Sequence, residues 1–172
     1  MGCACWIIIS AVSMSRKNKK GAILTEILFY HLERARLENI LPDLLQKSLQ
    51  NNWRAVLRVG SKEKLEALDD LLWHYNDESF LPHGCSGDAA DHPIWLTNGD
   101  DLPDRRDILF AVEGAGFSLT EIEKLTRCVL IFDGADSAQL EKARNSWTQI
   151  KDSPHEATYW RQNSHGRWEK AA

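Results

Sequence analysis

The chain of 172 residues is long enough for one domain with a hydrophobic core and short for two. Its 21 basic and 25 acidic side chains are unevenly placed: residues 1–24 hold four basic residues and no acidic one, which leaves a net charge of −8 on the remainder. That charge argues against broad binding to a nucleic-acid backbone, which needs a clustered basic footprint, so any nucleic-acid role is expected to be indirect.

The N-terminal segment contains an apolar run, ACWIIISAV, with the positive charges after it rather than before it. That order is wrong for a secretory signal, and the run is shorter than the roughly 20 apolar residues of a membrane helix. We therefore expect residues 1–23 to be a disordered extension or a mis-assigned start, with the folded domain over residues 24–172 and no membrane contact. In the second case, Leu24 would correspond to a non-standard initiation codon that is translated as methionine.

In chain order, the body alternates strand-like segments with amphipathic helical ones. Enrichment in β-branched and aromatic residues predicts strands over residues 25–32, 54–59, 94–97, 107–112 and 127–132. Apolar residues at helical spacing predict helices over residues 37–51, 61–75 and 137–151. Two overlapping capping-box signals begin a short helix at 118–120, and residues 157–162 and 167–169 flank a loose hairpin. The alternation predicts a single α/β domain with a Rossmann-like three-layer α/β/α fold and a mainly parallel sheet.

The segment from Leu65 to Gly84 places a helical pattern directly before an aromatic, proline-containing loop. At about 100° per residue, one apolar stripe contains Leu65, Leu68, Leu71, Leu72 and Tyr75. Trp73 falls outside this stripe, on the side shared with Glu66 and Asp69. Exposed aromatic patches mark interaction sites, so Trp73 indicates a contact surface. The alternative is a ring that folds back over the edge of the helix.

The helix over 137–151 carries a second candidate surface. Its apolar stripe contains Leu140, Ala143, Trp147 and Ile150. Arg144 and Lys151 are seven residues apart and fall on one edge of that stripe, roughly 10 Å from each other. Cations beside an aromatic and aliphatic border suit a short peptide with acidic and apolar residues. The alternative is that the long side chains only cover the edge of the core.

Enzymatic chemistry has little support in the sequence. The glycine-rich turn nearest to a phosphate loop is Gly114-Ala115-Gly116, and the third glycine of the dinucleotide fingerprint is replaced by Leu119. No nucleophile elbow is present, the six histidines lie in no catalytic motif, and Asp69 and Asp70 do not share a helix face. A nucleotide-binding or hydrolytic enzyme on a Rossmann-like fold remains the alternative class. A direct binder of single-stranded DNA conflicts with the charge.

The cysteines indicate neither a disulfide framework nor a metal site. There are four of them: Cys3, Cys5, Cys85 and Cys128. No CxxC pair occurs, so a reducing cytoplasm is the simpler assumption. Cys85 with His83 and His92 fits no standard zinc spacing. We expect no metal and no other cofactor.

Several segments form a recognisable series. The most specific is LEALDDLLWHYNDESFLPHG at Leu65–Gly84, in which LD, W, SF and PH follow one another. The segments TEILFYHL, DILFAV, and QLEKARNSW followed by TYW agree with it in order and spacing. From Thr25 to the C-terminal region, the chain resembles the chi subunit family of bacterial DNA polymerase III holoenzyme. The resemblance implies a non-catalytic accessory protein with a Rossmann-like fold.

The resemblance also implies two partners and their sites. Family members bind the acidic, phenylalanine-ended C-terminal tail of single-stranded-DNA-binding protein through basic and aromatic residues of the last long helix, here Arg144 and Trp147. The next position is commonly lysine in the family and is Thr148 here, so Lys151 or Lys142 is expected to compensate.

The second partner that the resemblance implies is the psi subunit, which links family members to the clamp loader. The family's tryptophan and phenylalanine for this contact correspond to Trp73 and Phe80. DNA would then be reached only indirectly, through these two protein partners.

Overall fold

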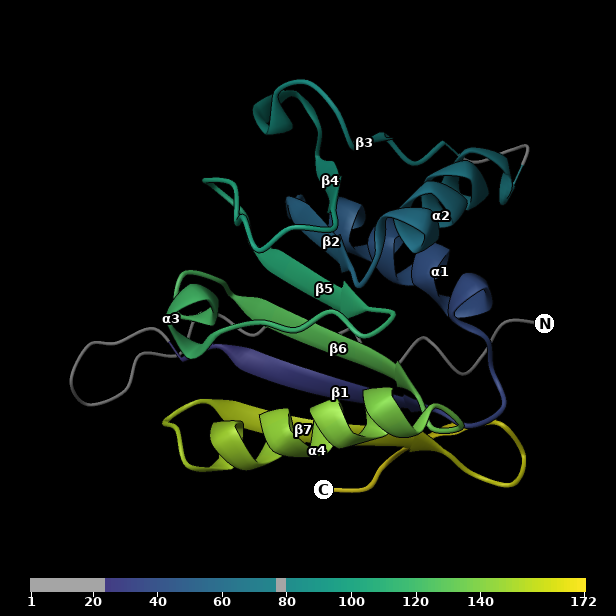
Figure 1. Ribbon diagram of the computed structural model, residues 1–172, viewed down its shortest axis with the longest axis vertical. Helices are drawn as coiled ribbons and strands as arrows, with labels where there is room; N and C mark the ends of the chain where they lie inside the picture. Colours follow the sequence, from purple (N-terminus) through teal and green to yellow (C-terminus); the bar gives the residue numbers. More distant parts are fainter. Residues whose placement is uncertain (1–23, 77–79) are drawn as a thin grey trace.

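A single eight-stranded sheet forms the centre of the molecule, in the computed structural model that describes residues 24–76 and 80–172 (Figure 1). The predictions for residues 1–23 lie outside the described residues. The strand order is β3-β4-β2-β5-β6-β1-β7-β8, and all neighbours are parallel except the antiparallel pair β7 and β8. The strands are β1 (Glu26–Leu32), β2 (Ala55–Val59), β3 (His83–Gly84), β4 (Ile94–Thr97), β5 (Ile108–Val112), β6 (Arg127–Asp133), β7 (Glu156–Gln162) and β8 (Trp168–Lys170).

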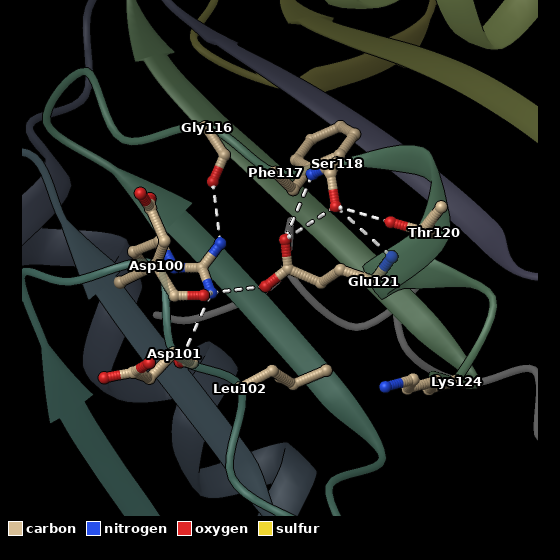
Figure 2. A pocket seen from close by; sticks show the side chains of 10 residues that line it. Asp100, Asp101, Leu102, Gly116, Phe117, Ser118, Thr120, Glu121 and Lys124 are labelled. Atoms are coloured by element: carbon tan, nitrogen blue, oxygen red, sulfur yellow. Dashed lines mark hydrogen bonds and ion pairs between the residues drawn. The ribbon is translucent and has the colours of Figure 1, made fainter.

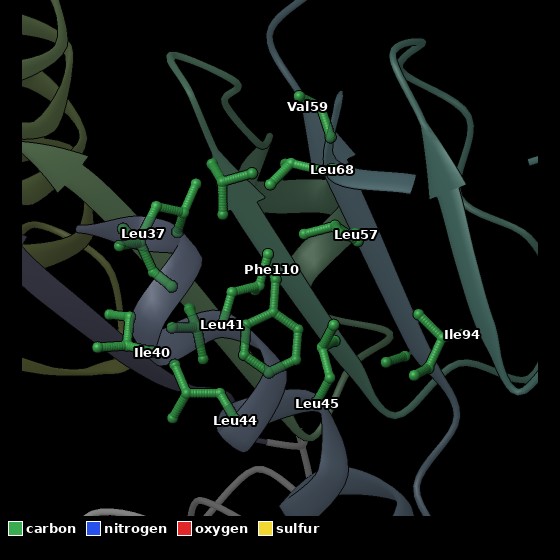
Figure 3. Close-up of a cluster of buried hydrophobic side chains, with 14 of the residues drawn as sticks. Leu37, Ile40, Leu41, Leu44, Leu45, Leu57, Val59, Leu68, Ile94 and Phe110 are labelled. Carbon is green, nitrogen blue, oxygen red and sulfur yellow. The ribbon is translucent and has the colours of Figure 1, made fainter. Parts of the chain in front are cut away.

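The helices cover both faces of the sheet. Alternate residues of β1 show the division: Leu28 and Tyr30 belong to one buried cluster, and Ile27 and Phe29 to the other. The first cluster lies under α1 (Leu37–Gln50) and α2 (Lys62–His74), and part of it is drawn in Figure 3. The second lies under α3 (Leu119–Ile122) and α4 (Ser137–Lys151). The predicted Rossmann-like three-layer fold with a mainly parallel sheet is confirmed.

The element bounds follow local signals closely. Helix α2 begins after Ser61, whose hydroxyl accepts a hydrogen bond from the Lys64 backbone, and the short α3 begins at a capping box formed by Ser118 and Glu121. The sequence did not predict β3 or the 3₁₀ helix Ala89–Asp91. Strand β3 is only two residues long, too short for its own sequence to carry a strand signal. It is defined by its pairing with β4.

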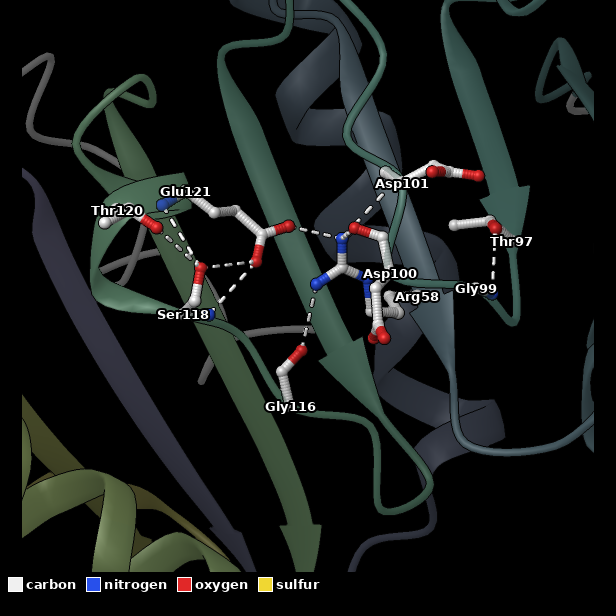
Figure 4. Close-up of polar contacts among 9 residues, drawn as sticks. All are labelled: Arg58, Thr97, Gly99, Asp100, Asp101, Gly116, Ser118, Thr120 and Glu121. Carbon is white, nitrogen blue, oxygen red and sulfur yellow. Dashed lines mark hydrogen bonds and ion pairs between the residues drawn. The ribbon is translucent and has the colours of Figure 1, made fainter.

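Two features of the topology position the surfaces described below. Strand β1 lies between β6 and β7, so that Phe29 is in register with Tyr159 on β7. The connection from β4 to β5 contains no helix, so polar loops rather than a helix lie over this part of the sheet on the α3 side (Figure 4). Among the described residues, no helix is long and apolar enough to cross a membrane.

Candidate functional site: a pocket on α4 and an aromatic surface on α2

One pocket lies between α4 and the last strands of the sheet, with a volume of about 340 Å³. We call it the α4 pocket, and its lining residues are Phe132, Leu140, Ala143, Arg144, Trp147, Thr148, Tyr159, Ala171 and Ala172. Its size is within the range of sites that bury a small ligand or a peptide terminus. Two of the four residues predicted for tail binding, Arg144 and Trp147, meet in it.

Trp147 is fixed by aromatic contacts on two sides. Its ring meets Phe29 edge-on at a centroid distance of 5.2 Å and Tyr159 at 5.6 Å, with interplanar angles of 81° and 87°. Helix α4 is anchored at its start, where the Asp136 carboxylate accepts hydrogen bonds from the backbones of Ala138 and Gln139. The pocket therefore has a rigid aromatic wall rather than a mobile one.

The cations predicted for this surface are divided between the two sides of α4. Arg144 is exposed and lines the α4 pocket, and the Lys151 Nζ lies 5.5 Å from the centroid of the Trp147 ring. The Lys142 Nζ instead donates to the Gly114 carbonyl at 3.0 Å and lines a separate cavity. Positions 142 and 144 are about 200° apart on a helix, and this geometric signal was already available in the sequence.

Several residues that line the α4 pocket come from strands, and the sequence analysis does not predict them as part of the site. Phe132 is the last residue but one of β6, Tyr159 lies on β7, and Ala171 and Ala172 follow β8. The Tyr159 hydroxyl is 2.9 Å from the Nδ1 of His31, whose ring stacks on Phe132 at 5.0 Å. Strand alternation places Ala157 and Tyr159 on one face, a signal that could have indicated Tyr159.

Burial shifts the pKa values of His31 and Tyr159. It lowers the pKa of His31, against the nearby charge of Glu33, and it raises the pKa of Tyr159. Arg144 and Arg161 lower both pKa values through their charges. Near neutral pH the imidazole of His31 is therefore uncharged, and the pocket's positive charge comes from arginine.

The second candidate surface lies at the end of α2. Trp73 is 54% exposed and Phe80 is 69% exposed, with their ring centroids 5.8 Å apart. The Trp73 ring also rests on His83, at 4.8 Å. His83 is buried, donates from Nδ1 to the Leu81 carbonyl at 2.6 Å, and places its Nε2 3.4 Å from Asp69. We call Trp73 and Phe80 the Trp73 surface; the predicted exposure of Trp73 is confirmed.

A different cavity, of about 720 Å³, lies between the loops that cover β2 (Figure 2). Its central group is Arg58, which is only 3% exposed. The guanidinium donates to the carbonyls of Gly116 at 3.1 Å, Asp100 at 3.0 Å and Asp101 at 3.3 Å, and it forms an ion pair with Glu121 (Figure 4). Arg58 thus ties two loops and α3 to the sheet.

The contacts around Arg58 hold local structure together. The Ser118 hydroxyl accepts the backbone hydrogen bond of the capping box of α3, which Glu121 completes. Burial opposes ionisation of Glu121, but hydrogen bonds from Arg58 and the Ser118 backbone outweigh it and lower its pKa. The resulting carboxylate lies at the N-terminus of α3. A phosphate bound after the turn Gly114–Gly116 would need this same position, which the negative charge of Glu121 already occupies.

The fold is that of a Rossmann-like α/β protein, with a pocket on α4 and an exposed aromatic pair at the end of α2. The family model for "DNA polymerase III chi subunit, HolC" matches residues 24–158, and the chain belongs to this family.

Two curated relatives agree with the family model. The chain is 25% identical over 104 residues to "Probable DNA polymerase III subunit chi" of Rickettsia prowazekii (strain Madrid E), covering 59% of this chain and 60% of that protein. It is 28% identical over 76 residues to "DNA polymerase III subunit chi" of Pseudomonas aeruginosa (strain PAO1), covering 43% of this chain and 54% of that protein. The chain thus spans somewhat more than half the length of these relatives.

Proposed function

We propose that this chain is a non-catalytic accessory subunit of a bacterial DNA polymerase III holoenzyme. It bridges the clamp loader, through a psi subunit, to the acidic C-terminal tail of single-stranded-DNA-binding protein during DNA replication in the cytoplasm. The observation that carries the proposal is the α4 pocket, in which an exposed Arg144 stands beside a fixed aromatic wall.

The pocket's chemistry matches a chain that ends in phenylalanine. The terminal ring enters the α4 pocket against its wall of Trp147 and Tyr159, and Arg144 receives the terminal carboxylate. No ion pair among the described residues engages Arg144 or Lys151, so both charges are available to a ligand. Exposed charge pairs contribute only about 0.2–1 kcal/mol each. Salt therefore weakens binding, and the apolar anchor retains most of the rest.

The Trp73 surface serves the other partner. Two large exposed aromatic side chains in contact are the kind of anchor on which interface energy concentrates. The ring of Trp73 rests on the buried His83, whose Nδ1 donates to the Leu81 carbonyl, so the surface is preorganised. The two surfaces involve different helices, α2 and α4, and can be occupied together.

The test crosses one variant of each surface with both partners. Arg144→Ala should weaken binding of an acidic, phenylalanine-ended peptide at least several-fold in a low-salt titration and leave co-purification with psi intact. Trp73→Ala should do the reverse. Lys124→Ala removes an exposed cation at the separate Arg58 cavity and is the matched control.

Three results would oppose the proposal. An unchanged dissociation constant for Arg144→Ala removes α4 as the tail site. Unfolding of Trp73→Ala would make Trp73 a core residue instead. A melting temperature raised by nucleotides and not by the peptide would favour the alternative, a nucleotide-binding or hydrolytic enzyme.

A further inference from the structure

The α4 pocket has a second wall that lies outside the family match. The match ends at residue 158, whereas Tyr159, Ala171 and Ala172 all line the pocket. The Tyr159 backbone N–H donates to the Ala172 carbonyl at 2.9 Å, and the Ala171 N–H donates to the Tyr159 carbonyl at 2.7 Å. The segment after β8 therefore continues its antiparallel pairing with β7 and closes one side of the pocket.

Arg161 lies two residues beyond Tyr159 on β7, next to this second wall. Ala157 and Tyr159 pack in the buried cluster beneath α4, and Trp160 packs in the opposite one. Strand alternation therefore directs Arg161 to the α4 side, about 7 Å further along β7 than Tyr159. Its register neighbour on β1 is His31, whose ring stacks on the pocket residue Phe132.

The charge of Arg161 is exposed and uncommitted. No ion pair among the described residues involves it. Its positive charge acts on both His31 and Tyr159, as does that of Arg144, so the two arginines flank one aromatic group. Acids also lie nearby: Glu33 and Asp133 act on His31, and Glu169 is in register with Arg161.

Helix α4 carries no cation at the position that follows Trp147. Thr148 lines the pocket without charge, and its hydroxyl donates to the Arg144 carbonyl at 3.1 Å. Lys142 faces the separate cavity at Gly114. A ligand whose terminal carboxylate meets Arg144 thus finds Lys151 as a further positive charge on α4 and Arg161 as one on β7.

We propose that Arg161 is a specificity-determining residue of the α4 pocket, which selects peptides with acidic residues before a C-terminal aromatic one. Arg161 binds a carboxylate that precedes the terminus, and the segment 171–172 holds the peptide between β7 and α4. This inference rests on the proposed function, and it adds a contact from a part of the chain beyond the family match.

The experiment measures binding of two peptides that end in phenylalanine, one with aspartates before the terminus and one with asparagines in their place. Arg161→Gln should raise the dissociation constant of the acidic peptide about two- to fivefold at low salt, the range of one exposed charge pair. It should leave the asparagine peptide unaffected. Arg161→Lys should retain most of the affinity for the acidic peptide. A circular-dichroism melt of each variant checks that the fold is kept.

Lys170→Gln is the matched control. Lys170 is exposed on the same hairpin and is in register with Trp160, on the opposite face, so it loses the same charge away from the pocket. The inference is overturned if the dissociation constant of Arg161→Gln for the acidic peptide equals that of the wild type, or if Lys170→Gln changes it by the same factor. In either case, weaker binding by Arg144→Ala would still support the proposed function. If the wild-type chain binds neither peptide, both fall.

Discussion

Arg58→Met tests whether the contacts at the Arg58 cavity stabilise the fold. The substitution keeps a long side chain on β2 and removes the guanidinium that holds the loops at Asp100–Asp101 and at Gly116. It also removes the ionic partner of Glu121, whose side chain is 12% exposed. Both partners of the pair are thus largely shielded from water, and the contact cannot be replaced by solvent without movement of the loops.

The expected loss follows from these contacts. Each carbonyl hydrogen bond contributes about 1 kcal/mol to stability, and removing one partner of a buried ion pair costs roughly 3–5 kcal/mol. Glu121 keeps its hydrogen bond from the Ser118 backbone, which moderates the cost. We therefore expect the free energy of unfolding to fall by about 3–5 kcal/mol, and the double variant Arg58→Met/Glu121→Gln to lose less than the sum of the single losses.

The assay is urea unfolding at pH 7, followed by circular dichroism. A loss below about 1 kcal/mol would refute the structural role, because surface substitutions typically lie within about 0.5 kcal/mol of zero. Additive single losses would show that Arg58 and Glu121 act independently. The tail-peptide affinity of the folded variant should match the wild type, since the cavity and the α4 pocket share no lining residue.

Two further predictions concern Glu121 and Thr148. The pKa of Glu121 is lowered from its ordinary 4.5, so the stability that its charge contributes is fully present above pH 4.5 and is lost as the pH falls through the lowered pKa. The stability difference between the wild type and Glu121→Gln, measured by urea unfolding at several pH values, should therefore shrink in acid. A difference that stays constant with pH would show that it does not come from the Glu121 charge. Thr148→Lys adds a cation at a position that lines the α4 pocket. In a low-salt titration, this variant should bind the acidic peptide about two- to fivefold more tightly than the wild type. An unchanged dissociation constant would show that the peptide does not pass this position.

The sequence predicted elements well where its signals are local. The helix expected over 137–151 begins and ends as α4 does, because the Asp136 cap and the apolar periodicity belong to consecutive residues. Trp73 was placed off the buried stripe by the same periodicity, and its exposure follows. Strand β3 was missed because two residues carry no period.

The sequence by itself thus determined the alternation of strands and helices, the acidic body, the exposed Trp73 and the helix that carries Arg144. Only the tertiary structure decided what meets Arg144: Phe132, Tyr159 and the segment 171–172 come together there. The physical reason is that strand order is fixed by long-range packing and hydrogen bonding, which place β7 beside β1 and β8 beside β7. No local period contains that information, so the second wall of the pocket and the role of Arg161 could be inferred only from the fold.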